Sequence, residues 1–140
     1  MLYLPKPNMN KQTIRIEREL KSSSLPIIWN IISTPEGLSK WLADEVSQDE
    51  NKLFFTWGKS WSHHETKSAT IGEAVRNSHF KFHWDNEDDG NTFVELRIER
   101  GELTNDHILI ITDHAETDEV DFLEGLWEDN LERLHRTCGL

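Results

Sequence analysis

The chain has 140 residues, which fits one domain, and a chain of this length buries about two thirds of its unfolded surface when it folds. A composition that is 36% hydrophobic, with six Trp and six Phe, excludes an intrinsically disordered chain even though 29% of the residues are charged. The net charge of -11 opposes binding to nucleic acid and to anionic lipid, because both depend on clustered Lys and Arg.

The chain also lacks sequence signals for export or membrane insertion. Its single cysteine, Cys138, cannot form a disulfide within the chain, and no apolar stretch reaches the roughly 20 residues of a membrane helix. The N-terminal "MLYLPKPNMNK" contains two prolines and too short an apolar segment for a secretory signal. We therefore expect a soluble cytoplasmic protein, with residues 1–10 as a tail and residues 11–140 as one domain.

Residues 11–20, "KQTIRIEREL", are predicted to form a strand. Ile14, Ile16 and Leu20 share one face of a two-residue period, with mostly charged residues on the other, as a half-buried strand requires. Arg18 interrupts this alternation.

Two short helices are predicted next. The first covers residues 25–33, with Ser24 as a suitable N-cap and Pro26 in the first turn, where a missing N–H has no helical partner. The second begins at Thr34, with Pro35 at its first position. Three apolar residues then fall on one side of it by the i, i+3, i+4 rule: Leu38, Trp41 and Leu42.

The pattern from residue 46 to 115 indicates strands separated by polar turns. The segments are "KLFFTW", "KSATIGEAV", "HFKFHW", "TFVELRIE" and "HILIITDH", all rich in aromatic and β-branched residues. An additional short strand over residues 45–48 would give six or seven mostly antiparallel strands in all. The buried face is expected to carry Phe80, Phe82, Trp84, Val94, Leu96 and Ile98. "HILIITDH" is apolar on both faces, so its facing stays open.

The last segment, residues 118–137, is predicted to be a long amphipathic helix capped by Thr117 or Asp118. Its apolar arc contains Leu123, Leu126, Trp127, Leu131 and Leu134. The order of the elements predicts an α+β fold, in which a curved antiparallel sheet wraps around the C-terminal helix.

Three segments carry a family resemblance: "ISTPEGLSKWLAD", "FKFHW" and "LWEDNLERLHR". Over residues 12–137 the chain resembles the START-like SRPBCC superfamily, within it the branch similar to the C-terminal domain of the activator of the heat-shock-protein ATPase. The resemblance implies the helix-grip fold of the birch-pollen allergen, with a hydrophobic cavity between sheet and helix and with Leu38, Trp41 and Leu42 in its wall or lid. Members often have a Gly directly before the helix Trp, whereas here Leu126 separates Gly125 from Trp127.

Aromatic side chains are the main candidates for a ligand surface, because rings offer large contact areas at little conformational cost. Packing in the core is the alternative for each of them. Asn130 lies within the apolar arc of the final helix, where it would orient a ligand or hydrogen-bond to the sheet or to a buried water. The predicted ligand-binding residues are Leu38, Trp41, Leu42, Phe55, Trp57, Phe80, Phe82, Trp84, Leu96, Leu123, Trp127 and Asn130.

No metal, cofactor or catalytic residue is predicted. The seven histidines lack the spacing of a metal site, and the acidic runs "DNEDDG" and "ETDEVD" do not match the calcium loop of an EF-hand, so solvated surface is the favoured reading. Asp113 and Glu95 would form an acid–base pair only if both faced the cavity.

The first functional hypothesis is a non-enzymatic protein that binds a hydrophobic, lipid-like or aromatic small molecule in the cavity. One alternative is a co-chaperone-like module that binds a protein partner through acidic and aromatic surface. A cyclase-like enzyme is the third. The sequence leaves open the ligand's identity and the oligomeric state.

Overall fold

Seven strands form one antiparallel sheet in the part of the chain that the computed structural model describes, namely residues 11–22, 24–58, 64–87 and 91–140. They are β1 (Lys11–Glu19), β2 (Glu45–Asp49), β3 (Lys52–Gly58), β4 (His64–Val75), β5 (His79–Trp84), β6 (Val94–Arg100) and β7 (His107–Glu116). The sheet order is β1-β7-β6-β5-β4-β3-β2, so the first strand crosses over to pair with the last. The predicted tail, residues 1–10, lies outside the described residues.

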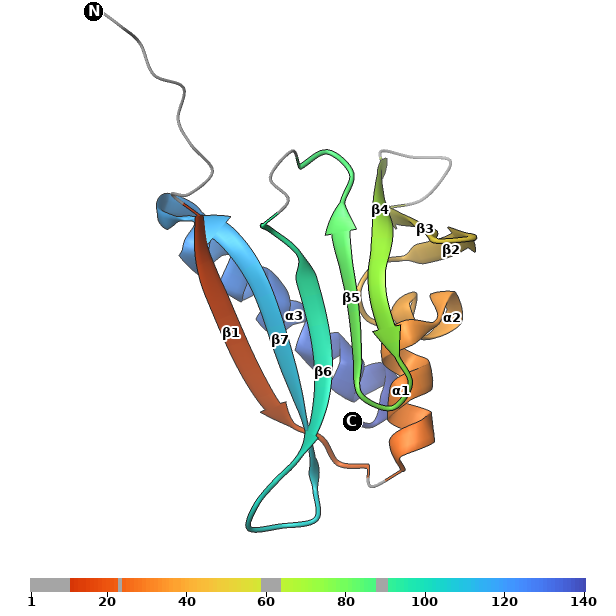
Figure 1. Ribbon diagram of the computed structural model, residues 1–140, viewed down its shortest axis with the longest axis vertical. Helices are drawn as coiled ribbons and strands as arrows, with labels where there is room; N and C mark the ends of the chain where they lie inside the picture. The colour runs from red at the N-terminus through yellow and green to blue at the C-terminus, as the bar shows by residue number, and fades with distance from the viewer. Residues whose placement is uncertain (1–10, 23, 59–63, 88–90) are drawn as a thin grey trace, which may run out of the picture.

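Three α-helices accompany the sheet in these residues: α1 (Leu25–Ser33), α2 (Pro35–Leu38) and α3 (Val120–Cys138). Figure 1 shows α3 running obliquely across one face of the curved sheet, with α1 and α2 near β4. The predicted α+β helix-grip arrangement is thereby confirmed, with seven strands. None of the helices in the described ranges is long and apolar enough to span a membrane.

Three details of the elements differ from the prediction. Ser24 occupies the N-cap of α1, but its side chain makes no capping hydrogen bond. A short 3₁₀ turn, Thr117–Glu119, precedes α3, so the N-cap is Glu119 rather than Thr117 or Asp118. β4 begins at His64, three residues before the predicted strand, because pairing with β3 continues through charged residues that carry no apolar signal.

The corner between α1 and α2 is built from a threonine cap and a glycine. Thr34 Oγ1 accepts a hydrogen bond from Gly37 N at 3.0 Å and donates one to Asn30 O at 2.7 Å. A Cβ on Gly37 would lie 2.3 Å from Asn30 O, so the two helices approach closely enough to leave room only for hydrogen at this position. The corner directs Leu38 and Trp41 into the core, where both are fully buried.

One face of the sheet carries the core. Alternate residues of β5 and β6 are buried there, as predicted: Phe80, Phe82, Val94, Leu96 and Ile98, with Trp84 half-buried. The facing of β7, which the sequence left open, is settled by Leu109 and Ile111, which belong to this core. α3 packs onto it through Trp127, Leu131 and Leu134.

Polar contacts fix α3 at both edges of the sheet. Arg18, the residue that interrupts the apolar pattern of β1, forms an ion pair with Glu128 on α3. Arg133 donates to Ala43 O at 3.1 Å, in the segment between α2 and β2. The helix ends at Gly139, whose φ of 74° is the left-handed cap that glycine adopts without strain.

A separate polar network lies around Asp85, at the end of β5. Its carboxylate accepts hydrogen bonds from Thr70 Oγ1 at 2.6 Å, Ser68 Oγ at 2.7 Å and Lys52 Nζ at 3.0 Å. These bonds hold the pKa of Asp85 down to about 2, because all three donors favour the charged carboxylate. The network cross-links β3 and β4 to the end of β5.

Candidate ligand-binding cavity

A cavity of about 480 Å³ lies between α3 and the ends of β3, β4 and β5. The sheet contributes Phe55, Trp57, Glu65, Lys67, Phe82, Trp84 and Asp113, and the remaining lining residues are Leu42, Phe122, Leu123, Leu126, Trp127, Asp129 and Asn130. Phe122 is 69% exposed, so the cavity opens to solvent beside the first turns of α3.

An aromatic wall forms the sheet side of the cavity. The ring centroids of Phe55 and Trp84 are 5.1 Å apart, and those of Phe82 and Trp84 are 5.3 Å apart. β4 separates β3 from β5, so their backbones lie about 9.5 Å apart. Phe55 pairs with Lys67 and Trp84 pairs with Ala69, so the two rings approach diagonally across β4, where Ala69 is small and fully buried.

Trp57 extends this wall and connects it to the segment after α2. Its ring stacks on Phe55 with an interplanar angle of 15°. Its indole N–H donates a 2.9 Å hydrogen bond to Leu42 O. The half-buried indole therefore has its polar group satisfied, and Leu42 is held at the cavity edge.

The helix side of the cavity comes from α3. Leu123, Trp127 and Asn130 recur at the three- and four-residue spacing of one helix face. Within the described residues the Asn130 amide makes no hydrogen bond to the protein, so the alternative of a bond to the sheet is not realised. The half-buried amide faces the cavity with its donors and acceptor free.

Asp113 is the buried acid of the cavity. Its Oδ2 accepts a 2.9 Å hydrogen bond from Trp127 Nε1, and its Oδ1 accepts one from His114 N at 2.7 Å. Burial raises the pKa of Asp113 above its ordinary value, although these two bonds oppose the shift. Glu95 pairs in register with Thr112, the neighbour of Asp113, so Glu95 and Asp113 point to opposite faces of the sheet and cannot form an acid–base pair.

The strand β4 brings charge to the cavity. Glu65 and Lys67 point to the same face of β4 as Ala69. They pair in register with Trp57 and Phe55 on β3. The Lys67 ammonium lies 4.4 Å from the centroid of the Trp84 ring, a cation–π contact.

Comparisons with known proteins agree with this architecture. Residues 8–140 match the family model of the START-like superfamily domain. The chain belongs to the START-like superfamily. No curated protein matches it significantly.

Several solved structures share the fold of this START-like domain. BfR322 from Bacteroides fragilis is 38% identical, with 93% of each chain covered and a TM-score of 0.61. The Aha1 dimer from Colwellia psychrerythraea is 17% identical over 88% of this chain and 92% of its own, with a TM-score of 0.66. The AHSA1-like protein from Aeromonas hydrophila is 12% identical over 89% and 93%, with a TM-score of 0.68. The predicted resemblance to Aha1-like proteins is thereby confirmed.

The predicted ligand-binding residues of the START-like domain divide into two groups. Those on the cavity are Leu42, Phe55, Trp57, Phe82, Trp84, Leu123, Trp127 and Asn130. The others are buried in the core without lining the cavity: Leu38, Trp41, Phe80 and Leu96. Sequence reasoning missed Glu65, Lys67, Phe122, Leu126 and Asp129 as lining residues, and it named Asp113 only as a possible acid. The two-residue period Glu65, Lys67, Ala69, Ile71 was the signal that could have placed the first two.

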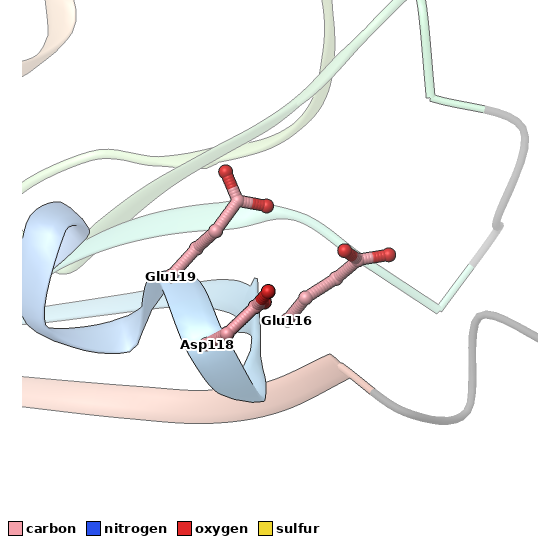
Figure 2. A group of neighbouring side chains, drawn as sticks. All are labelled: Glu116, Asp118 and Glu119. Carbon is pink, nitrogen blue, oxygen red and sulfur yellow. The ribbon is translucent and has the colours of Figure 1, made fainter.

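One acidic cluster lies outside the cavity of the START-like domain. Figure 2 shows Glu116, Asp118 and Glu119, which extend from the junction of β7 and α3. One carboxylate oxygen from each lies within 4.8 Å of the others. Asp118 and Glu119 are exposed, and acids just before a helix interact favourably with its dipole, which accounts for the cluster without a metal.

Proposed function

We propose that this START-like domain works in the cytoplasm as a non-enzymatic binding protein that holds a hydrophobic, lipid-like or aromatic small molecule between the sheet and α3. The observation that supports this function is the 480 Å³ cavity with its aromatic wall. Small-molecule sites usually have volumes of about 300–1,000 Å³, mostly apolar linings and a few placed polar groups.

The shape of the cavity favours an elongated or ringed ligand. An apolar cavity of about 150 Å³ suffices for benzene, so this larger space suits several rings or a folded acyl chain. Phe55 and Phe82, which belong to this wall, are almost completely buried, so packing fixes the geometry of the wall. A ligand would therefore meet a preformed surface, which keeps the entropic cost of binding low.

The polar groups favour binding over catalysis. Asp113 is the only buried carboxyl among the lining residues that the structure describes, and both of its oxygens already accept hydrogen bonds. Glu95 lies on the other face of the sheet and supplies no second group. A paired acid and base for proton transfer would require two converging side chains.

A dye titration with cavity-filling variants tests the proposal. N-phenyl-1-naphthylamine, a neutral apolar dye, should bind with increased fluorescence. Leu123→Trp fills the space beside α3 and should weaken binding about tenfold or more. Leu126→Trp, at the 45% exposed position of the mouth, repeats the test with less risk to folding.

Leu103→Trp is the matched control, because Leu103 is 99% exposed in the β6–β7 loop. It should bind the dye like the parent. Absence of dye binding, or equal binding by the parent and both cavity variants, would refute the function. Native mass spectrometry of freshly purified protein adds an independent readout, since a retained molecule should be lost from Leu123→Trp.

One observation favours a second function, binding of a protein partner. Phe122 and Leu126 are 69% and 45% exposed and lie one helical turn apart on α3. Phe122→Ser should abolish such an interaction while leaving the deeper ring wall intact. Stimulation of a heat-shock ATPase by the parent but not by this variant would support a co-chaperone-like role.

A further inference from the structure

The cavity combines aromatic rings with an excess of carboxyl groups. Four ionisable side chains line it in the described part of the chain: the acids Glu65, Asp113 and Asp129, and the base Lys67. We propose that its ligand is an organic cation, an apolar or aromatic molecule that carries a protonated or quaternary amine. This inference rests on the proposed small-molecule binding and adds the charge of the ligand.

Lys67 shows where a cationic group would lie. Its ammonium sits 4.4 Å from the centroid of Trp84, within the roughly 6 Å range of a cation–π contact. Trp57 lies beside Trp84, with ring centroids 6.2 Å apart and planes inclined at 50°, so a second indole adjoins the ring that Lys67 contacts. The lysine side chain is long and flexible, and a ligand amine can take its place on the ring while Lys67 moves toward solvent.

Carboxyl groups complete the site for a cation. Glu65 is an exposed residue two positions before Lys67 on the same face of β4, and it pairs in register with Trp57 on β3. Asp129 contributes an exposed carboxylate from α3. Rings that attract a cation electrostatically, next to carboxylates that pair with it, are the chemistry that recognises organic ammonium groups.

Asp113 provides an acceptor deeper in the cavity. Each of its oxygens accepts one hydrogen bond, from Trp127 and from His114, and each carboxylate oxygen has capacity for a second. A carboxylate buried in apolar surroundings is costly without a cationic partner. A ligand ammonium donating to Asp113 would supply that partner.

Anionic ligands face the opposite situation. The described lining residues include three acids and one base, which carry a formal charge of -2 when all four groups are ionised. The whole chain carries -11, so its field repels fatty carboxylates and attracts cations. Among the lining residues that the structure describes, an anion would find only Lys67 as a cationic partner.

Three ligands that differ only in head group test the inference. We would titrate the parent protein with 4-phenylbutylamine, 4-phenylbutanol and 4-phenylbutanoate at neutral pH and about 0.15 M salt, following tryptophan fluorescence and calorimetry. The amine should bind most tightly, about tenfold or more tighter than the carboxylate, with the alcohol between them. Equal or reversed affinities overturn the cation preference and leave the proposed function standing, because the alcohol still binds. If none of the three binds, both fail.

Charge variants separate the site from the general field of the protein. Glu65→Gln should weaken amine binding about threefold to fivefold and leave alcohol binding unchanged. Lys67→Met should strengthen amine binding and weaken carboxylate binding, a change of opposite sign that structural damage would not produce. Glu102→Gln, in the β6–β7 loop that Figure 1 places at the far end of the sheet, is the control and should change neither affinity. If Glu102→Gln weakens amine binding as much as Glu65→Gln does, the cation binds the surface field and the inference is wrong.

Discussion

Replacement of Gly37 by alanine tests how closely α2 packs on α1. An added Cβ would lie 2.3 Å from Asn30 O, 2.5 Å from Ile31 Cα and 2.6 Å from Ile31 O. All three atoms belong to the backbone of α1, so no side-chain rotation relieves the overlap. Ordinary contact begins at 3.4 Å, and α2 must therefore move about 1 Å away from α1.

The displacement of α2 sets the loss of stability expected for Gly37→Ala. Overpacking a core typically costs about 1–3 kcal/mol, and a clash with backbone belongs at the upper end of that range. Alanine forms a helix more readily than glycine, which offsets at most about 1 kcal/mol of this cost. The free energy of unfolding should fall by about 2 kcal/mol. With an unfolding entropy near 2.1 cal/mol/K per residue, this corresponds to a Tm lower by about 7 °C for a chain of this length.

Urea unfolding followed by tryptophan fluorescence, together with thermal melts, measures the change. Gly125→Ala on α3 is the matched control, because no neighbouring atom lies within 4 Å of the added Cβ. It should raise the free energy of unfolding by about 0.5–1 kcal/mol. Leu42 follows α2 in the chain and lines the cavity, so Gly37→Ala should also weaken dye binding. A Gly37→Ala variant as stable as the parent would refute the close approach of the two helices.

Three further predictions concern charged groups. The depressed pKa of Asp85 contributes stability that is present above its unfolded pKa and lost as the pH falls toward about 2. Asp85→Asn should therefore lower the free energy of unfolding by about 1 kcal/mol at neutral pH, because the site is partly exposed and screened, and the loss should shrink in acid urea titrations below about pH 4. The raised pKa of Asp113 makes stability depend on pH in the opposite direction. The stability that this group contributes to the folded protein is present below its unfolded pKa and is lost as the pH rises through its folded pKa. Asp113→Asn should consequently gain stability relative to the parent as the pH rises in the same titrations. Arg133→Met removes the hydrogen bond to Ala43 O and should cost about 1–2 kcal/mol, with faster amide exchange in residues 39–44.

Each of these predictions has a contrary result. A constant difference between Asp85→Asn and the parent at all pH values would mean that the hydrogen bonds do not depend on its charge. A fall in the relative stability of Asp113→Asn with rising pH would contradict the burial of an ionisable acid. Unchanged exchange in residues 39–44 of Arg133→Met would show that this segment is held by its apolar contacts alone.

Local patterns were sufficient to predict most of the fold. The helix over residues 25–33 and the strand over residues 79–84 have the predicted bounds, because apolar periodicity and proline placement act within a few residues. The buried faces of β5 and β6 also followed from alternation, since one sheet face has to be covered by α3.

The cavity lining depended on information that the periodicity does not contain. Phe80 and Phe82 share a strand face, yet only Phe82 lines the cavity, because α1 places Trp29 against Phe80 with ring centroids 6.5 Å apart. Glu65 and Lys67 lie on the cavity-facing side at the start of β4, where Glu65 is exposed and Lys67 half-buried, so a polar sequence gave no reason to expect lining residues there. Asp113 sits in a strand that is apolar on both sides, so its facing was decided by pairing with β1 and β6.

The alanine at position 69 makes one surface out of aromatic residues from two non-adjacent strands. A valine or leucine there would push Phe55 and Trp84 apart, because Ala69 is fully buried beside them. The separation of these two rings, and so the size of molecule that the cavity accepts, thus depends on a few methyl groups at one site, two residues along β4 from Lys67.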